Sequence, residues 1–174
     1  MKSHETFGYA TFATPFGGFS VAVDASGALA AAAFGGAGAL RGRLKNAGLV
    51  NEPAATAAAR RQLGEWLRGE RRRFSLRLSP RGTAFQRRVW RALARIPYGQ
   101  TRSYGQVARR VGSSPRAVGR ANATNPLCVV VPCHRVIGGN GALTGYAFGE
   151  RTKGRLLRLE GAAAVSARSP RAPR

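Results

Sequence analysis

The chain has 174 residues, and its 29 lysines and arginines outweigh 7 aspartates and glutamates to give a net charge of +22. A chain of this length can bury a core without disulfides or a structural metal, as one domain or as a domain with a smaller companion. The charge predicts a polyanionic partner, of which nucleic acid is the commonest. No apolar run approaches the roughly 18 residues of a membrane span, so we expect no membrane association.

The chain contains two cysteines, Cys128 and Cys133, which are too few for a disulfide framework. The residues before Thr11 include charged side chains and lack the apolar segment of a secretion signal. Both observations favour a cytoplasmic protein. Apart from His134, beside Cys133, the sequence has one histidine, His4, so no usual zinc spacing is present and we predict no metal and no cofactor.

Residues 1–79 are predicted to form a small α+β domain. Apolar and polar residues alternate there as in strands, and one longer segment has helical spacing. The expected elements are a turn at 15–18, a strand at 19–23, a hairpin turn at 24–27, an alanine-rich strand at 28–34, a flexible loop at 35–38, a helix at 53–67 between a capping Asn51 and a terminating Gly69, and a strand at 71–78. The segment 79–82, with a proline and a glycine, is the predicted boundary to the next domain.

Residues 80–161 are predicted to form a second, mostly helical domain, followed by a disordered basic tail at 162–174. The expected elements are a helix at 84–96, a short helix at 103–111 capped by Ser103, a turn at Gly112, a second short helix that begins at Pro115 and is capped by Ser114, a buried strand at 127–131, a loop at 138–145 and a helix at 152–160. Two short helices joined by a tight glycine turn form a helix-turn-helix pattern.

This helix-turn-helix pattern carries arginines and small residues, which favours DNA contact over an ordinary corner between two core helices. The arginines are Arg109, Arg110, Arg116 and Arg120, and the small residues of the second helix are Ala117, Gly119 and Ala121. No asparagine or glutamine lies in the first turn of that helix to read adenine, which disfavours sequence-specific recognition. Small residues allow close approach to the duplex, and a long side chain such as Arg116 can then reach into it, as base extrusion requires.

Cys133 is the candidate nucleophile. It follows an apolar segment and Pro132, and a thiol becomes nucleophilic when it ionises near a base or a cation. His134 and Arg135 are the nearest such groups in the sequence. Neighbours in a regular strand point to opposite faces, so the thiol and the imidazole can cooperate only if the chain turns at Pro132. The alternative is a buried cysteine that packs as a small apolar residue, an interpretation that fits Cys128 well.

Several motifs resemble those of the O6-alkylguanine-DNA alkyltransferases, also called methylated-DNA–protein-cysteine methyltransferases. These motifs are Ile96-Pro97-Tyr98-Gly99, Ser103-Tyr104, Ser114-Pro115-Arg116-Ala117-Val118-Gly119, Asn125-Pro126, Val131-Pro132-Cys133-His134-Arg135-Val136, Gly145-Tyr146, Leu156-Leu157 and Glu160-Gly161. The resemblance covers about residues 83–161 and is looser before them, at Thr14-Pro15-Phe16-Gly17 and the following strand. It implies a ribonuclease-H-like N-terminal α+β domain without catalytic residues.

The resemblance also implies direct DNA repair, in which Cys133 displaces the alkyl group from O6-alkylguanine in double-stranded DNA and is not regenerated. His134 would take the thiol proton through a water, Glu160 would hold His134, and Asn125 would brace the turn that carries Cys133. Tyr104 would assist base flipping and donate a hydrogen bond to guanine N3. The other implied residues are Val136, Tyr146, Ala147 and Phe148 around the base, Arg116 in the place of the flipped base, and Ser103, Ser114, Ala117, Gly119 and Arg120 on the DNA.

Two residues depart from the family pattern. Phe148 stands where the family usually has a glycine, and we expect it to narrow the pocket against bulky groups such as benzyl. Arg120 stands where small residues are common, and we expect it to contact a phosphate. The protein is expected to act as a monomer without an obligate protein partner, and O4-alkylthymine is a second candidate substrate.

Three other functions remain open at this point. A relative that binds lesions without alkyl transfer is disfavoured by the presence of Cys133, unless Phe148 blocks the transfer. A transcriptional regulator would need sequence-specific affinity, which the small-residue helix disfavours. A Cys-His hydrolase would need an oxyanion hole, which the sequence does not reveal.

Overall fold

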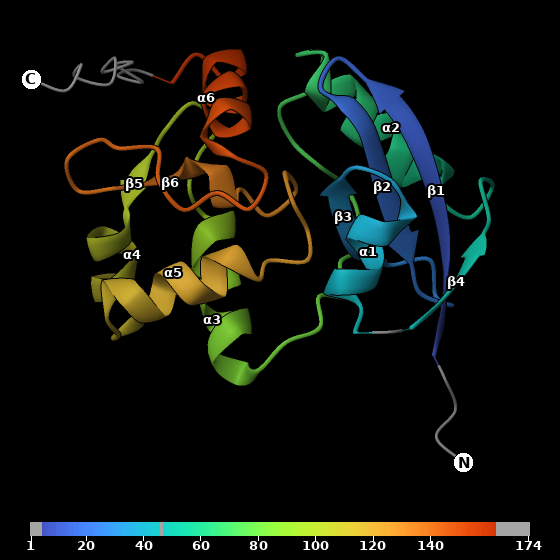
Figure 1. The fold of residues 1–174 in the computed structure, drawn as a ribbon, viewed down its shortest axis with the longest axis horizontal. Coiled ribbons are helices and arrows are strands. Elements are labelled where there is room, and N and C mark those ends of the chain that lie inside the picture. The colour runs from blue at the N-terminus through green and yellow to red at the C-terminus, as the bar shows by residue number, and fades with distance from the viewer. Residues whose placement is uncertain (1–4, 46, 163–174) are drawn as a thin grey trace, which may run out of the picture.

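The computed structural model describes residues 5–45 and 47–162. A four-stranded sheet with two helices forms the N-terminal half, and a group of helices forms the C-terminal half (Figure 1). The predicted α+β class is confirmed. Within the described residues no helix has the length and apolar character needed to cross a membrane. His4 and residues 163–174 of the predicted tail lie outside the described residues.

The sheet is a three-stranded antiparallel meander with a fourth strand added in parallel at one edge. Its strands are β1 (Thr6–Thr14), β2 (Gly17–Val23), β3 (Leu29–Phe34) and β4 (Gly48–Asn51), in the order β3-β2-β1-β4. At the β1–β2 turn, the Thr14 hydroxyl donates to the Gly17 carbonyl at 2.7 Å. At the β2–β3 turn, Asp24 Oδ1 accepts from the N–H groups of Ser26 and Ala28. These local hydrogen bonds explain why both turns form where the sequence predicts them.

Each face of the sheet is covered by one helix. Helix α2 (Ala57–Leu67) places Trp66 in the core that contains Phe19 of β2. Helix α1 (Ala37–Arg43) places Leu40 against the other face, where the sheet residues of β2 and β3 are fully buried alanines. The small alanine side chains allow α1 to lie close to the sheet, so its last turn reaches the C-terminal half.

The strand predicted over 71–78 is wrong. The segment is extended, but its one ladder contact is an isolated bridge from Leu78 to Leu29. A side chain of α2 holds the segment instead: the Gln62 amide donates to Ser75 Oγ at 3.0 Å and accepts from the Ser75 N–H at 2.9 Å. Alternating apolar residues therefore mark a half-buried extended segment here, which touches β3 at one bridge and forms no ladder with it.

Two helix starts also differ from the sequence expectations. The loop expected at 35–38 is wrong in part, because α1 begins at Ala37, and β4 was not predicted. Helix α2 begins at Ala57 rather than at residue 53, since the Thr56 hydroxyl bonds to the carbonyl of Glu52 and holds the preceding residues in a turn. Its predicted end is confirmed, with Gly69 in the left-handed region at φ 79°.

The C-terminal half contains the predicted helix-turn-helix. Its elements are α3 (Ala84–Ala94), β5 (Arg102–Ser103), α4 (Tyr104–Val111), α5 (Pro115–Ala123), η1 (Cys133–Arg135), β6 (Val136–Ile137) and α6 (Glu150–Leu159). Ser103 Oγ accepts from the Gln106 N–H, and Ser114 Oγ accepts from the Ala117 N–H, so both serines are N-caps as predicted. Gly112 makes the turn at φ 65°.

The strand predicted at 127–131 is wrong as well. The segment forms a tight turn whose first residues bond to the N-terminal sheet: Leu127 bridges to Ala32, and the Cys128 N–H donates to the Ala32 carbonyl at 3.0 Å. Val129 has φ 74°, a left-handed conformation that is unusual for a β-branched residue. The apolar run thus serves as a buried turn between the two halves.

One core extends across both halves. It contains Phe19 and Trp66 from the N-terminal half together with Val89 and Leu156 from the C-terminal half. The domain boundary predicted at residues 79–80 therefore stays a prediction, since burial is continuous across it.

Candidate active site

The turn that carries Cys133 is braced by one buried amide. Asn125 Nδ2 donates to the Val131 carbonyl at 2.9 Å, and Asn125 Oδ1 accepts from the Leu127 N–H at 3.0 Å. From α1, Arg43 Nη1 donates to the Asn125 carbonyl at 2.7 Å. The chain then enters the single turn of η1, so Cys133 and the next residue are not on opposite faces of a strand.

Several groups lower the pKa of the Cys133 thiol, which is 5% exposed. A hydrogen bond from Cys128 contributes most, a hydrogen bond from Asn125 adds to it, and the positive charges of Arg43 and Lys153 act in the same direction against the effect of burial. The sequence prediction that His134 and Arg135 supply the perturbing charge is wrong. The thiolate is instead favoured by groups from α1, α6 and the buried turn.

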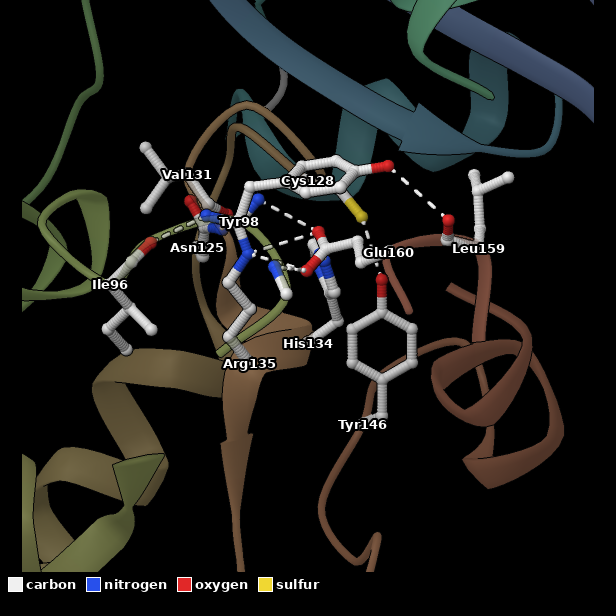
Figure 2. Close-up of polar contacts among 11 residues, drawn as sticks. Ile96, Tyr98, Asn125, Cys128, Val131, His134, Arg135, Tyr146, Leu159 and Glu160 are labelled. Atoms are coloured by element: carbon white, nitrogen blue, oxygen red, sulfur yellow. Dashed lines mark hydrogen bonds and ion pairs between the residues drawn. The ribbon is translucent and has the colours of Figure 1, made fainter. Parts of the chain in front are cut away.

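His134 and Glu160 form a buried pair. His134 Nε2 lies 2.7 Å from Glu160 Oε1, and both side chains are fully buried (Figure 2). Burial lowers the pKa of His134, so the imidazole is neutral at pH 7. The carboxylate can only accept, which places the ring proton on Nε2. Nδ1 is buried and makes no hydrogen bond to any residue that the structure describes, so its lone pair is available to take a proton.

Glu160 is held by more than the histidine. The Arg135 guanidinium donates to both of its carboxylate oxygens at 2.8–3.0 Å, and the Gly99 N–H donates to Oε2 at 3.0 Å. Arg135 Nη1 also donates to the Ile96 carbonyl. Figure 2 shows His134 and Arg135 both directed at the Glu160 carboxylate. Burial alone would raise the pKa of Glu160, but hydrogen bonds from His134 and Arg135 lower it to about 2.

Phe148 closes the cavity beside Cys133. The cavity has a volume of only about 10 Å³, and its lining is Arg43, Asn122, Ala123, Asn125, Cys128, Cys133, Gly145, Tyr146, Ala147 and Phe148. The Phe148 ring packs edge-on against Phe34 and Tyr146, and the Arg43 guanidinium lies 4.8 Å from its centroid. This volume holds about one water, so a bound base needs Phe148 or its neighbours to move.

Of the five predicted base contacts, Tyr146, Ala147 and Phe148 line this cavity, and Val136 and Tyr104 do not. Tyr146 is buried and Ala147 is exposed at the rim, whereas Val136 lies in β6, outside the cavity lining. Tyr104 begins α4 and donates from Oη to the Thr144 carbonyl at 3.2 Å. The structure thus brings Tyr104 to the loop that also carries Gly145 and Tyr146.

The predicted DNA contacts lie on the helix-turn-helix. Arg116 and Arg120 are exposed and one turn apart on α5, and neither guanidinium forms a hydrogen bond or ion pair with a residue that the structure describes. Gly119 faces Tyr104, because an added Cβ would lie 3.9 Å from that ring. The hydroxyls of Ser103 and Ser114 are used as helix caps.

Lys153 is a residue of the site that the sequence reasoning missed. It is fully buried in α6, its Nζ donates to the Thr144 carbonyl at 3.1 Å, and it lies 5.7 Å from the Tyr104 ring centroid. Burial lowers its pKa to about 8. A sequence signal existed, since Lys153 falls on the same helical face as Leu156, Leu157 and Glu160. Arg43 was missed too, and no local pattern distinguishes it from the other arginines.

Within residues 5–45 and 47–162, no group of three or more histidine, cysteine, aspartate or glutamate side chains could hold a metal ion. The predicted absence of a metal site stays a prediction for the whole chain.

Comparison with known proteins gives a consistent set of similarities. A family model described as "6-O-methylguanine DNA methyltransferase, DNA binding domain" matches residues 84–162. The methylated-DNA–protein-cysteine methyltransferase of Mycolicibacterium paratuberculosis is 54% identical over 115 residues, which are 65% of this chain and 70% of that protein. The constitutive enzyme of the same name from Bacillus subtilis is 57% identical over 108 residues, 60% of this chain and 65% of that one.

The similarity to solved structures extends over more of the chain than the match to the family model. Mycobacterium tuberculosis OGT in complex with DNA aligns with a TM-score of 0.77 and 40% identity, over 88% of this chain and 92% of that one. The M. tuberculosis O6-methylguanine methyltransferase structure aligns with a TM-score of 0.76 and 38% identity, over 92% and 96%. The similarity therefore includes the N-terminal sheet, which the family model does not cover.

Proposed function

Because the chain belongs to the family of methylated-DNA–protein-cysteine methyltransferases, it is a DNA-repair methyltransferase, and we propose Cys133 as the residue that accepts the alkyl group of an O6-alkylguanine. The observation that carries the assignment is the buried set of groups behind this thiol. Cys133 has a lowered pKa, and the adjacent His134 has a free Nδ1 and an Nε2–H bound to Glu160.

The reaction is a displacement at carbon. The Cys133 Sγ–carbon bond forms as the carbon–O6 bond breaks, and the guanine gains the proton that the thiol loses. His134 Nδ1 is the group that takes this proton, through a water, because its other nitrogen is already committed to Glu160. The thioether is stable, so each molecule reacts once. Tyr104 donates a hydrogen bond to guanine N3 and thereby stabilises charge that develops on the leaving base.

The helix-turn-helix is proposed to bind the duplex through its minor groove. Arg116 replaces the flipped base in the stack, and Arg120, one turn further along α5, contacts a phosphate. Ala117 and Gly119 allow α5 to approach the duplex closely, while Ser103 and Ser114 fix the helix ends that face the DNA. Most of the affinity then comes from phosphates, which suits lesions that occur in any sequence.

The proposal includes a monomer that acts without a protein partner in the cytoplasm. Both cysteines are free thiols in the structure, as a reducing compartment requires. The acceptance of O4-alkylthymine belongs to the same proposal, since the reacting carbon is again attached to an exocyclic oxygen.

The test is a mass measurement. The protein is mixed with a duplex that carries one O6-methylguanine, and intact and peptide masses are recorded for the wild type and for Cys133→Ser. We expect one added methyl group per wild-type molecule, on the Cys133 peptide, and none on the variant. Tight binding of the lesion with an unmodified Cys133 would instead assign the protein to the lesion-binding class and remove the proton-transfer role of His134.

A further inference from the structure

A second thiol lies in the same cavity as the proposed nucleophile. Cys128 and Cys133 are both buried, and both line the small cavity beneath Phe148. Cys128 Sγ also lies 3.1 Å from the Tyr146 hydroxyl oxygen, and Figure 2 shows the sulfur aimed at that hydroxyl. Interpreting Cys128 as a simple apolar core residue therefore leaves its contact with Tyr146, and its place beside Cys133 in the cavity, unexplained.

The proton positions follow from the surroundings. Burial raises the pKa of Tyr146 and the pKa of Cys128, so both groups keep their protons at pH 7. Of the two thiols only that of Cys133 has a lowered pKa, so Cys133 ionises first, and its sulfur as a thiolate can only accept. If the one proton of Cys128 is donated to this thiolate, the Cys128 sulfur is left to accept from the Tyr146 hydroxyl, which lies within hydrogen-bond distance.

We propose that Cys128 is a positioning residue for the alkyl transfer: its S–H donates a hydrogen bond to the Cys133 thiolate, and the Tyr146 hydroxyl orients it by donating to its sulfur. The inference rests on the proposed function, because it takes Cys133 as the alkyl acceptor. In a cavity with room for about one water, this bond is strengthened by the low local dielectric and has little competition from solvent.

The hydrogen bond from Cys128 is expected to raise the rate of methyl transfer by a small factor, which can be calculated. With the pKa of Cys133 at about 7, a shift of one pH unit changes the amount of thiolate by about tenfold at pH 6, and because the intrinsic nucleophilicity of the sulfur then falls about threefold, the reaction gains about threefold at that pH. Other groups act on the same thiolate from neighbouring elements: Arg43 from α1, Lys153 from α6 and Asn125 from the turn, and the Tyr104 and Tyr146 hydroxyls also face it. They remain in place when Cys128 is changed, which is why the loss should be partial.

The experiment compares Cys128→Ala, Cys128→Val and Cys128→Ser with the wild type. In all three variants Cys133 is the only thiol, so the ultraviolet absorbance of the thiolate titrates that residue alone. We expect the pKa of Cys133 to be about one pH unit higher in the Ala and Val variants than in the Ser variant, which keeps a hydroxyl donor. Single-turnover methyl transfer at pH 6 should fall about threefold for Ala and Val and recover at higher pH.

The three variants distinguish a role of Cys128 as a hydrogen-bond donor from a role in which it only fills space. Valine restores volume without a donor, so a normal Cys133 titration in the Val variant, or a Ser variant that behaves like Ala, would overturn the inference. Tyr146→Phe should shift the Cys133 titration in the same direction as Cys128→Ala. The proposed function fails separately, if wild-type Cys133 takes up no methyl group, and the thiolate titrations still decide the role of Cys128 in that case.

Discussion

Replacement of Glu160 by glutamine should destabilise the fold far more than the change of one atom suggests. The carboxylate accepts from His134 Nε2, from two nitrogens of Arg135 and from the Gly99 N–H, and its side chain is fully buried. Glutamine offers one accepting oxygen and places an NH₂ group against these donors, so it leaves the Arg135 charge buried without a counterion. Breaking a buried pair in this way costs about 3–5 kcal/mol.

The pKa of Glu160 gives an independent value for the stability that its interactions contribute. Its pKa falls from 4.5 to about 2 on folding, which corresponds to about 3 kcal/mol of stabilisation. Because the folded pKa is the lower one, this stabilisation is present above pH 4.5 and is lost as the pH falls toward 2. Glutamine cannot titrate, so the gap in stability between the wild type and Glu160→Gln should be largest at neutral pH and shrink in acid.

The assay is urea unfolding and thermal unfolding followed by circular dichroism at pH 7 and at decreasing pH. A loss of about 3 kcal/mol should lower the Tm by roughly 6–12 °C in a chain of this size. Glu70→Gln is the matched control, since Glu70 pairs with Arg68 on the surface with about half of each side chain exposed, and its Tm should not change. The reasoning is refuted if Glu160→Gln unfolds like the wild type at pH 7, or if the gap is independent of pH.

Three further predictions concern DNA and substrate. Phe148→Gly should raise the rate of transfer from O6-benzylguanine at least tenfold relative to O6-methylguanine, and equal rates for both substrates in the wild type would contradict the idea that Phe148 narrows the pocket. Arg120→Ala should weaken DNA binding equally for all sequences and reduce the salt slope by about 1, whereas a sequence-dependent loss would exclude a phosphate contact. Gly145→Ala should lower the free energy of unfolding by about 1–2 kcal/mol, because Gly145 has a left-handed backbone conformation. It should also slow methyl transfer in a single-turnover assay, because the new Cβ would lie 2.9 Å from Tyr104 Oη, whereas Gly139→Ala, in open space, should have neither effect.

The sequence was most informative where local chemistry decides the structure. Ser103, Ser114 and Gly112 were predicted as two caps and a turn because each acts on the backbone within a few residues. The strands predicted at 71–78 and 127–131 failed for the opposite reason. Whether an apolar extended segment becomes a strand depends on a partner elsewhere in the chain, and here the partners are a glutamine side chain and an edge of β3.

The same distinction explains which parts of the site were predictable. The pairing of His134 with Glu160 was anticipated from the family resemblance, and the structure places these side chains together. The sequence analysis expected the nearby Arg135 to be a cation that acts on Cys133. In the structure Arg135 contacts Glu160 instead. Adjacency in sequence says little about charge in a folded site, because η1 turns successive side chains in different directions.

The N-terminal half contains no residue with a proposed proton-transfer role, yet two of its side chains complete the site. The Trp66 ring packs edge-on against His134, with centroids 5.7 Å apart, and limits the orientations of the imidazole. Arg43 contacts the Asn125 carbonyl and the Phe148 ring, and no carboxylate pairs with it in the described residues. An arginine paired with a carboxylate would offer the thiolate little net field, whereas this one keeps its full charge. The scarcity of acidic residues, which looks like a compositional bias in the sequence, thus has a local consequence. It leaves the partly buried Arg43 without a carboxylate partner in the described residues, so that its charge can stabilise the Cys133 thiolate.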